Sequence, residues 1–375
     1  MSLGFLSRCS PVADLSSSCK GLSDAKENED TVLIKTDSTD SLSRSRGLRD
    51  ITKEGGNSQK QGPATKAPKA TTKPVTKPVR AAAPAPAPAK KPMDLPKNLE
   101  EPEKDDVQAC TEYVQDVYSY FRKAEEKYMP TRGYMEEASK MQTADGKKVV
   151  NTKMRAIVVD WMIELHQRFR PSLQPAALYL GINVFDRFLA SGAMNESYRL
   201  QVIGAACLLV AAKIEEIYAP KVRELKKMVD GATAQEICIA ERAILVALKF
   251  NVSNPTVFHF MKRHLKAAEA DLKLKALTMY IVEVALHDVK MTEVKPSLLA
   301  SAAIHLGLCM LKREQTWTAT LQNETNYEAS DLKQCASQLT SLLGRVSTDD
   351  TLYAVSTKFR SSKYLEVGKV PVVSV

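Results

Sequence analysis

Apolar residues recur every three or four positions along most of the chain beyond residue 106, which is the spacing of one helix face. In the segment 151–169, Met154, Ile157 and Trp161 share such a face. Charged residues lie mostly on the other faces of the same segment. The pattern therefore predicts an amphipathic helix, and several further segments repeat it.

Two segments, 200–213 and 297–311, are apolar on nearly every side and rich in small residues. A helix of this kind is surrounded by other helices. Each is third in a run of five helical patterns, so we predict an all-α fold with two tandem five-helix units. The first unit is predicted from 151–169, 174–189, 200–213, 221–229 and 233–248, and the second from 257–265, 272–286, 297–311, a short segment around Leu321, and 331–343.

The first part of the chain differs in composition from the rest. Eight of the 18 prolines lie between residues 63 and 92, and aromatic residues are nearly absent before residue 105. Such a segment buries too little apolar surface to offset its chain entropy. We predict a disordered tail over 1–105, a leading helix and the first unit over 106–253, the second unit over 254–348, and a loosely ordered C-terminal tail over 349–375.

Charge and cysteine usage narrow the class of protein. The net charge is +9, but eight basic residues and no acidic one lie between 55 and 93, within the Pro-rich spacer. Without interleaved aromatic residues, this favours at most nonspecific contact with nucleic acid. The seven cysteines include no CxxC pair, and neither a signal peptide nor a membrane span is indicated. We therefore expect a soluble intracellular protein that binds neither membranes nor specific nucleic-acid sequences.

The sequence lacks the motifs that indicate an enzyme, such as a glycine-rich phosphate loop, a zinc-hydrolase motif or a nucleophile elbow. The five histidines are dispersed without metal-ligand spacing, so we expect no metal and no cofactor. Arg155, Asp160 and Glu164 lie mostly off the apolar face. Asp160 and Glu164 are one helical turn apart, and we interpret them as residues of a solvated face rather than as a catalytic pair. The function class that remains is a helical scaffold that binds other proteins.

Several motifs then resemble one family. The segment MRAIVVDWMIELH (154–166) resembles the first helix of a cyclin box. FDRFL (185–189) resembles its second helix, and AAKIEEIY (211–218) resembles the end of its third helix and the following turn. EYVQDVYSY (112–120) is similar to the helix that precedes the box in mitotic, B-type cyclins. The resemblance covers roughly 110–346 and implies two cyclin boxes, which agrees with the two helical units.

The resemblance implies a regulatory activity, in which the chain binds and activates a cyclin-dependent kinase and recruits its substrates. Catalysis would reside in the kinase. The family's substrate-docking patch would take Arg-x-Leu peptides, with Glu164 pairing the arginine. Spacing alone would instead favour a plain core role for the apolar members. The carried-over docking residues are Met154, Ile157, Trp161, Glu164, Leu200 and Gln201.

The resemblance also implies a kinase interface, in which Lys213 and Glu241 match the family's paired charges. A charge beside a core is costly unless it is paired, so the two are expected to meet. Ile214 stands where relatives often carry an aromatic residue. The other residues implied in this interface are Tyr113, Val117, Tyr120, Glu215, Leu245 and Phe250.

The tail carries possible degradation signals. Lys26-Glu27-Asn28 resembles a KEN degron, which the anaphase-promoting complex recognises. A degenerate destruction box is formed by Arg46, Leu48, Asp50 and Ile51, with Ser45 where the usual arginine would stand. The basic spacer is equally open to interpretation as a nuclear-import signal or as a solvated linker. We expect the protein in the nucleus and the cytoplasm.

Our interpretation is therefore a mitotic B-type cyclin that is destroyed by ubiquitin-mediated proteolysis. The nearest alternative is an A-type cyclin acting in S phase and G2. Alternatives from other classes are a transcription factor with cyclin-like repeats, which would bind DNA through folded basic faces, and a small helical enzyme.

Overall fold

The structure is a computed structural model that describes residues 97, 99, 100, 111–142, 144, 146, 148–169, 173–346 and 353–373. Nearly all of the predicted tail over 1–105 lies outside these residues. Within the described part of the chain, the regular elements are helices, apart from an isolated bridge between Gln142 and Lys148. The prediction of an all-α fold is confirmed.

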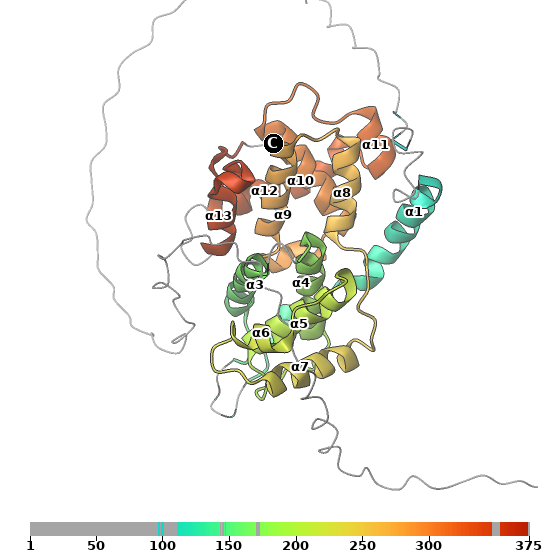
Figure 1. The fold of residues 1–375 in the computed structure, drawn as a ribbon. Helices are drawn as coiled ribbons and strands as arrows, with labels where there is room; N and C mark the ends of the chain where they lie inside the picture. The colour runs from blue at the N-terminus through green and yellow to red at the C-terminus, as the bar shows by residue number, and fades with distance from the viewer. Residues whose placement is uncertain are drawn as a thin grey trace, which may run out of the picture. The chain divides into compact units, whose positions relative to one another are not determined.

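Two five-helix runs follow a leading segment (Figure 1). The leading segment contains a 3-10 turn (Thr111–Tyr113), α1 (Val114–Ala124) and α2 (Tyr134–Ala138). The first unit comprises α3 (Thr152–Arg168), α4 (Pro175–Ala190), α5 (Leu200–Glu215), α6 (Val222–Lys226) and α7 (Ala234–Ala247). The second unit comprises α8 (Val257–Ala267), α9 (Leu272–Ala285), α10 (Pro296–Met310), α11 (Ala319–Thr325) and α12 (Ala329–Val346).

Capping residues set where the helices begin. The Asn151 side chain accepts a hydrogen bond from the Met154 N–H at 2.9 Å, and the Asp271 side chain accepts one from the Leu274 N–H at 2.8 Å. Each bond satisfies a backbone donor that has no partner inside the helix. α10 instead opens with a proline, whose missing N–H costs nothing at that position.

The central helices of the two units, α5 and α10, are buried along most of their length, as their composition predicts. Each contains a glycine at a close contact. A Cβ atom at Gly204 would lie 3.0 Å from Val158 of α3, and one at Gly307 would lie 3.0 Å from Leu274 of α9. Small residues here let neighbouring helices approach closely, which is why these two segments are rich in them.

The prediction of a loosely ordered tail over 349–375 is wrong for its described part. Residues Tyr353–Arg360 form α13, in which Val355 and Phe359 are completely buried. The interpretation of Asp160 as a solvated residue is wrong too, because it is buried and accepts backbone hydrogen bonds from α13. Sequence spacing missed both features, since the charge on α3 and the helix that it binds are distant along the chain.

Candidate functional site

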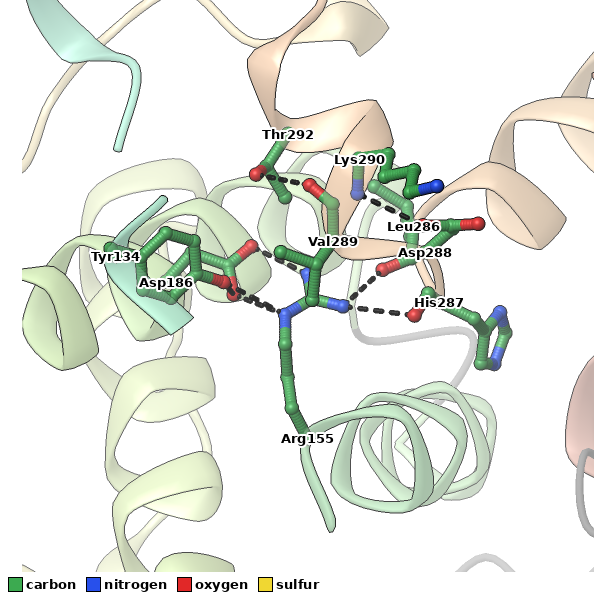
Figure 2. Close-up of polar contacts among 9 residues, drawn as sticks. All are labelled: Tyr134, Arg155, Asp186, Leu286, His287, Asp288, Val289, Lys290 and Thr292. Atoms are coloured by element: carbon green, nitrogen blue, oxygen red, sulfur yellow. Dashed lines mark hydrogen bonds and ion pairs between the residues drawn. The ribbon is translucent and has the colours of Figure 1, made fainter. Parts of the chain in front are cut away.

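A buried arginine joins α3 to α4 and to the second unit. Arg155 is completely buried and donates to both carboxylate oxygens of Asp186 at 2.7 Å. Its Nη1 donates to the backbone carbonyls of Leu286 and His287 at 3.0 and 3.1 Å (Figure 2). Burial alone would lower the pKa of Arg155, but the charge of Asp186 raises it, so the guanidinium keeps its charge.

The sequence placed Arg155 off the apolar face of its helix, and the structure corrects this. The Tyr134 hydroxyl donates to Asp186 at 2.8 Å and so completes the site from α2. No local signal reveals such a cluster, because its members come from separate helices. The bonds of Arg155 fix the position of α3, and the opposite face of the helix is not used in them.

That opposite face carries the predicted docking residues. Met154, Ile157 and Trp161 are partly exposed, and Glu164 is exposed. They therefore form a stripe along α3, which we call the docking stripe. A pure core role predicts full burial for its apolar members, and the structure does not place them so deeply.

Two further predicted docking residues begin the neighbouring helix α5. Leu200 and Gln201 are both partly exposed, and α5 packs against α3 through Gly204. Glu164 binds Arg168 of its own helix at 2.6 Å, with both side chains about half exposed. Separating this pair costs little because exposed ion pairs are weak, so the Glu164 carboxylate is accessible from solvent.

The predicted charge pair at the end of α5 is present. Lys213 Nζ lies 2.5 Å from Glu241 Oε1 of α7. The lysine side chain is half exposed, whereas the glutamate is largely covered. The contact joins the C-terminal end of α5 to the middle of α7 and leaves the lysine accessible from outside.

Apolar side chains surround the ends of these two helices. Ile214 is exposed, Leu245 is partly buried, and Phe250 is 69% exposed. Phe250 also has a left-handed backbone, with φ of 56°, which is unfavourable for a residue with a bulky side chain. Its N–H donates to the Leu245 carbonyl at 2.8 Å, which holds this turn. Partial burial, with the charge of Glu216, raises the pKa of Glu215.

The leading helix α1 and the turn before it present two apolar faces. One consists of Tyr118 and Phe121, which pack against α8. The other consists of the predicted interface residues Tyr113, Val117 and Tyr120, of which the two tyrosines are each 60% exposed. An uncovered apolar face of this kind is typical of a protein–protein contact.

The structure adds exposed apolar residues that the site prediction did not include, and two of them are the most exposed. Ile217 and Tyr218 directly follow α5 and are 91% and 85% exposed. They extend the apolar surface begun by Ile214. A signal was available in the sequence, because two apolar residues follow the acidic pair Glu215–Glu216 where a helix end would be solvated.

Other predictions remain outside the structure. The KEN residues Lys26, Glu27 and Asn28, and the degenerate destruction box from Arg46 to Ile51, lie outside the described residues. In the part of the chain that is described, no helix is long and apolar enough to cross a membrane. The same part contains no cluster of three or more His, Cys, Asp or Glu side chains placed to hold a metal ion.

Comparison with known families places two domain matches on this chain. The cyclin N-terminal domain matches residues 116–253, and the cyclin C-terminal domain matches residues 255–372. Together they span both five-helix units, and the second match continues through α13. These matches agree with the two tandem units predicted from helical periodicity.

Curated relatives point to one branch of that family. The chain is 35% identical over 273 residues to the G2/mitotic-specific cyclin-1 of Medicago sativa subsp. varia, covering 72% of this chain and 61% of the relative. It is 36% identical over 262 residues to cyclin-B2-1 of Arabidopsis thaliana, covering 70% and 58%. It is 34% identical over 279 residues to the G2/mitotic-specific cyclin-B of Dictyostelium discoideum, covering 74% and 61%. The matched region thus spans about three fifths of each relative's length.

Proposed function

The chain belongs to the cyclin family, and from that premise we propose that it binds and activates a cyclin-dependent protein kinase at entry into mitosis. Members of this family are regulatory subunits rather than enzymes, so the chemistry belongs to the partner. The G2/mitotic class of the relatives favours this role over the A-type and transcription-factor alternatives.

One observation carries the proposal above all. Every apolar kinase-contact residue proposed from the family is exposed except Leu245, which is partly buried, and these residues lie on three elements. These elements are α1 with its preceding turn, the end of α5 with the loop after it, and the end of α7. Exposed aromatic residues of this kind are the usual anchors of a protein interface. The Lys213–Glu241 pair lies between the last two elements and would fix their spacing.

The proposed mechanism is a shift between two kinase states. A cyclin that binds the active arrangement of the kinase's mobile helix more tightly than the inactive one moves the equilibrium toward activity. Phe250 and Ile214 would provide apolar contact, and Lys213 would provide a charge near the rim. The docking stripe on α3 would hold Arg-x-Leu substrates beside the activated kinase.

The test is reconstitution with a purified cyclin-dependent kinase and histone H1 as substrate. We expect the full chain to raise phosphorylation, and Phe250→Ala to weaken activation by about 10-fold or more, because buried aromatic anchors dominate interfaces. The matched control is Leu272→Ala, since Leu272 is 74% exposed but lies on α9 of the second unit. A kinase that stays inactive with the wild-type chain rules out the proposal, and equal losses in the two variants rule out the assigned surface.

The tail motifs support a proposal about turnover and location. The anaphase-promoting complex would recognise Lys26-Glu27-Asn28, and the basic spacer would supply nuclear import as well as lysines for ubiquitin. Replacing the tripeptide by alanines should prolong the life of the protein after mitosis. An unchanged half-life would exclude this degron and direct attention to Leu48. A fluorescent fusion that loses nuclear signal when the spacer's basic residues are replaced would support the import role, and unchanged signal would oppose it.

A further inference from the structure

A carboxylate of the first unit caps the C-terminal helix. Asp160 on α3 accepts hydrogen bonds from the Ala354 N–H at 2.9 Å and from the Val355 N–H at 3.3 Å, both at the beginning of α13. A negative charge at a helix N-terminus is favourable because the first N–H groups there have no partner inside the helix. α13 is therefore bound to the first unit by its N-terminal end.

The same helix is bound to the second unit by an ion pair. Lys358 Nζ lies 2.6 and 2.7 Å from the two carboxylate oxygens of Glu283 on α9. Both side chains are almost completely buried. Removing either partner would leave a buried charge without compensation, so the docked position of α13 requires both Lys358 and Glu283.

His287 lies at the point where these contacts meet. Its ring Nδ1 is 3.0 Å from the Glu283 carbonyl oxygen and 3.3 Å from the Val284 carbonyl oxygen. Its Nε2 is 3.2 Å from Oδ1 of Asp160. A neutral imidazole has only one N–H, whereas here each ring nitrogen faces an acceptor. The geometry is satisfied when the His287–Asp160 pair holds one additional proton.

The surrounding charges leave Asp160 as the partner of that proton. Arg155 of α3 donates to the backbone carbonyl of His287, not to its ring. Charged side chains that adjoin these contacts on α3, α9, α12 and α13 are paired with one another. These ion pairs are Arg155–Asp186, Lys358–Glu283 and Arg345–Asp288.

We propose that α13 is a latch between the two cyclin boxes, and that a proton held between His287 and Asp160 closes it. With the proton in place, the His287 ring donates both to the Glu283 carbonyl of its own unit and to Asp160. Asp160 at the same time accepts from the backbone of α13. Without the proton, a ring nitrogen lone pair faces the carboxylate, and the three-way contact between α3, α9 and α13 weakens. The latch concerns the chain alone and does not depend on kinase activation.

The direct test is nitrogen NMR of the full chain with labelled histidine. The chain has only five histidines, so the ring signals are few, and that of His287 can be assigned through its own backbone amide. We expect both ring nitrogens of His287 to carry protons at neutral pH, or one to share a proton with Asp160. A His287 ring with one bare nitrogen and no shared proton would overturn the proposal.

A second test compares melting temperatures of the wild type and His287→Gln from about pH 6 to about pH 9, a range that spans the ordinary imidazole titration near pH 6.5. A folded state that holds a proton which the unfolded chain releases loses stability as pH rises. The wild-type advantage should therefore shrink by about 2–4 °C across the range. An advantage that stays constant or grows with pH would overturn the latch.

His305→Gln is the matched control, because it predicts the opposite sign. His305 is buried on α10, and burial lowers its pKa. Its folded form therefore excludes a proton that the unfolded chain takes up, so the wild-type advantage over this variant should grow as pH rises. The same pH trend in both variants would mean that the His287 effect does not come from a proton in the latch.

Discussion

The first helices of the two cyclin boxes differ at the surface of the molecule. On α3 the stripe of Met154, Ile157 and Trp161 is partly exposed, whereas on α8 Phe260, Met261 and Leu265 are all buried. The neighbours of the two helices differ, because α8 packs against α10, α11 and α4, and α1 adds aromatic contacts with Phe260. The repeated unit does not itself decide which of its faces is free for partners.

The cover on α8 is specific as well as apolar. The Tyr118 hydroxyl donates to the His259 carbonyl at 3.2 Å, and the Phe121 ring lies 6.4 Å from that of Phe260 in an edge-on arrangement. Burial raises the pKa of Tyr118 to about 12, although the nearby charge of Arg263 opposes this. One face of α1 therefore packs on the second box, and its other face remains exposed.

On α3 the usual arrangement of a surface helix is altered on both sides, although Val159, Met162 and Ile163 remain in the core. Its inward side carries the charged residues Arg155 and Asp160, and part of its apolar surface faces outward. Buried ions make α3 strongly dependent on its partners, because each partner compensates a desolvated charge. Substitutions on the two sides of α3 should therefore differ greatly in their effect on stability.

The largest effect is expected on the inward side of α3. Arg155→Leu leaves Asp186 buried without its cation and should lower the free energy of unfolding by about 3–5 kcal/mol. Urea unfolding measures this. The control is Arg168→Leu, on the same helix but in an exposed pair with Glu164, which should cost about 1 kcal/mol or less. Similar losses in both variants would contradict the difference between the two faces.

For each pH unit of acidification, a smaller effect is expected from α8. Burial, together with the charges of Arg122 and Arg263, lowers the pKa of His264 to about 3. The unfolded chain takes up a proton below about pH 6.5 and the folded chain does not. Stability should therefore fall by about 1.4 kcal/mol for each pH unit below about 6.5, until the folded form is protonated too.

Urea unfolding at a series of pH values checks this prediction, with His264→Gln as the comparison. The variant lacks the titrating group and should lose most of the additional acid sensitivity. If its stability falls with pH as steeply as that of the wild type, the covered face of α8 is not the source of the slope.

The smallest effect on stability is expected on the outward side of α3. Replacing Met154 and Trp161 by alanine should cost only about 1–2 kcal/mol, because both side chains are partly exposed in the native fold. Binding of Arg-x-Leu peptides should nevertheless weaken, while kinase association persists. Fluorescence titration with a labelled peptide and copurification with the kinase measure the two activities. Loss of both together would indicate that these residues belong to the core.

Periodicity predicted most of the fold, and one kind of residue escaped it. Spacing located the leading helix and the ten helices of the two units, because each apolar stripe is a local property of the sequence. It misplaced Arg155 and Asp160, since their partners on α4, just after α9 and on α13 are distant along the chain. For the same reason it missed α13, whose Lys358 reads as a surface residue until Glu283 is seen beside it.

The candidate sites likewise have a part that the sequence predicted and a part that it did not. The cyclin motifs identified Lys213 and Glu241, and the structure brings the two together. Exposure could not be predicted, because spacing is identical for an apolar stripe that faces a core and one that faces solvent. Phe250 and Trp161 are therefore distinguished as surface residues only by their surroundings.

The sequence by itself determined the helices, their grouping into two units and the family, because helical periodicity and motif order are encoded in neighbouring residues. Only the tertiary structure decided which apolar stripe stays open, which charges are buried, and that the C-terminal segment joins both boxes. The physical reason is that covering and charge pairing depend on elements that meet in space. The cost of a buried charge or the freedom of an apolar face is settled only when its neighbours are in place.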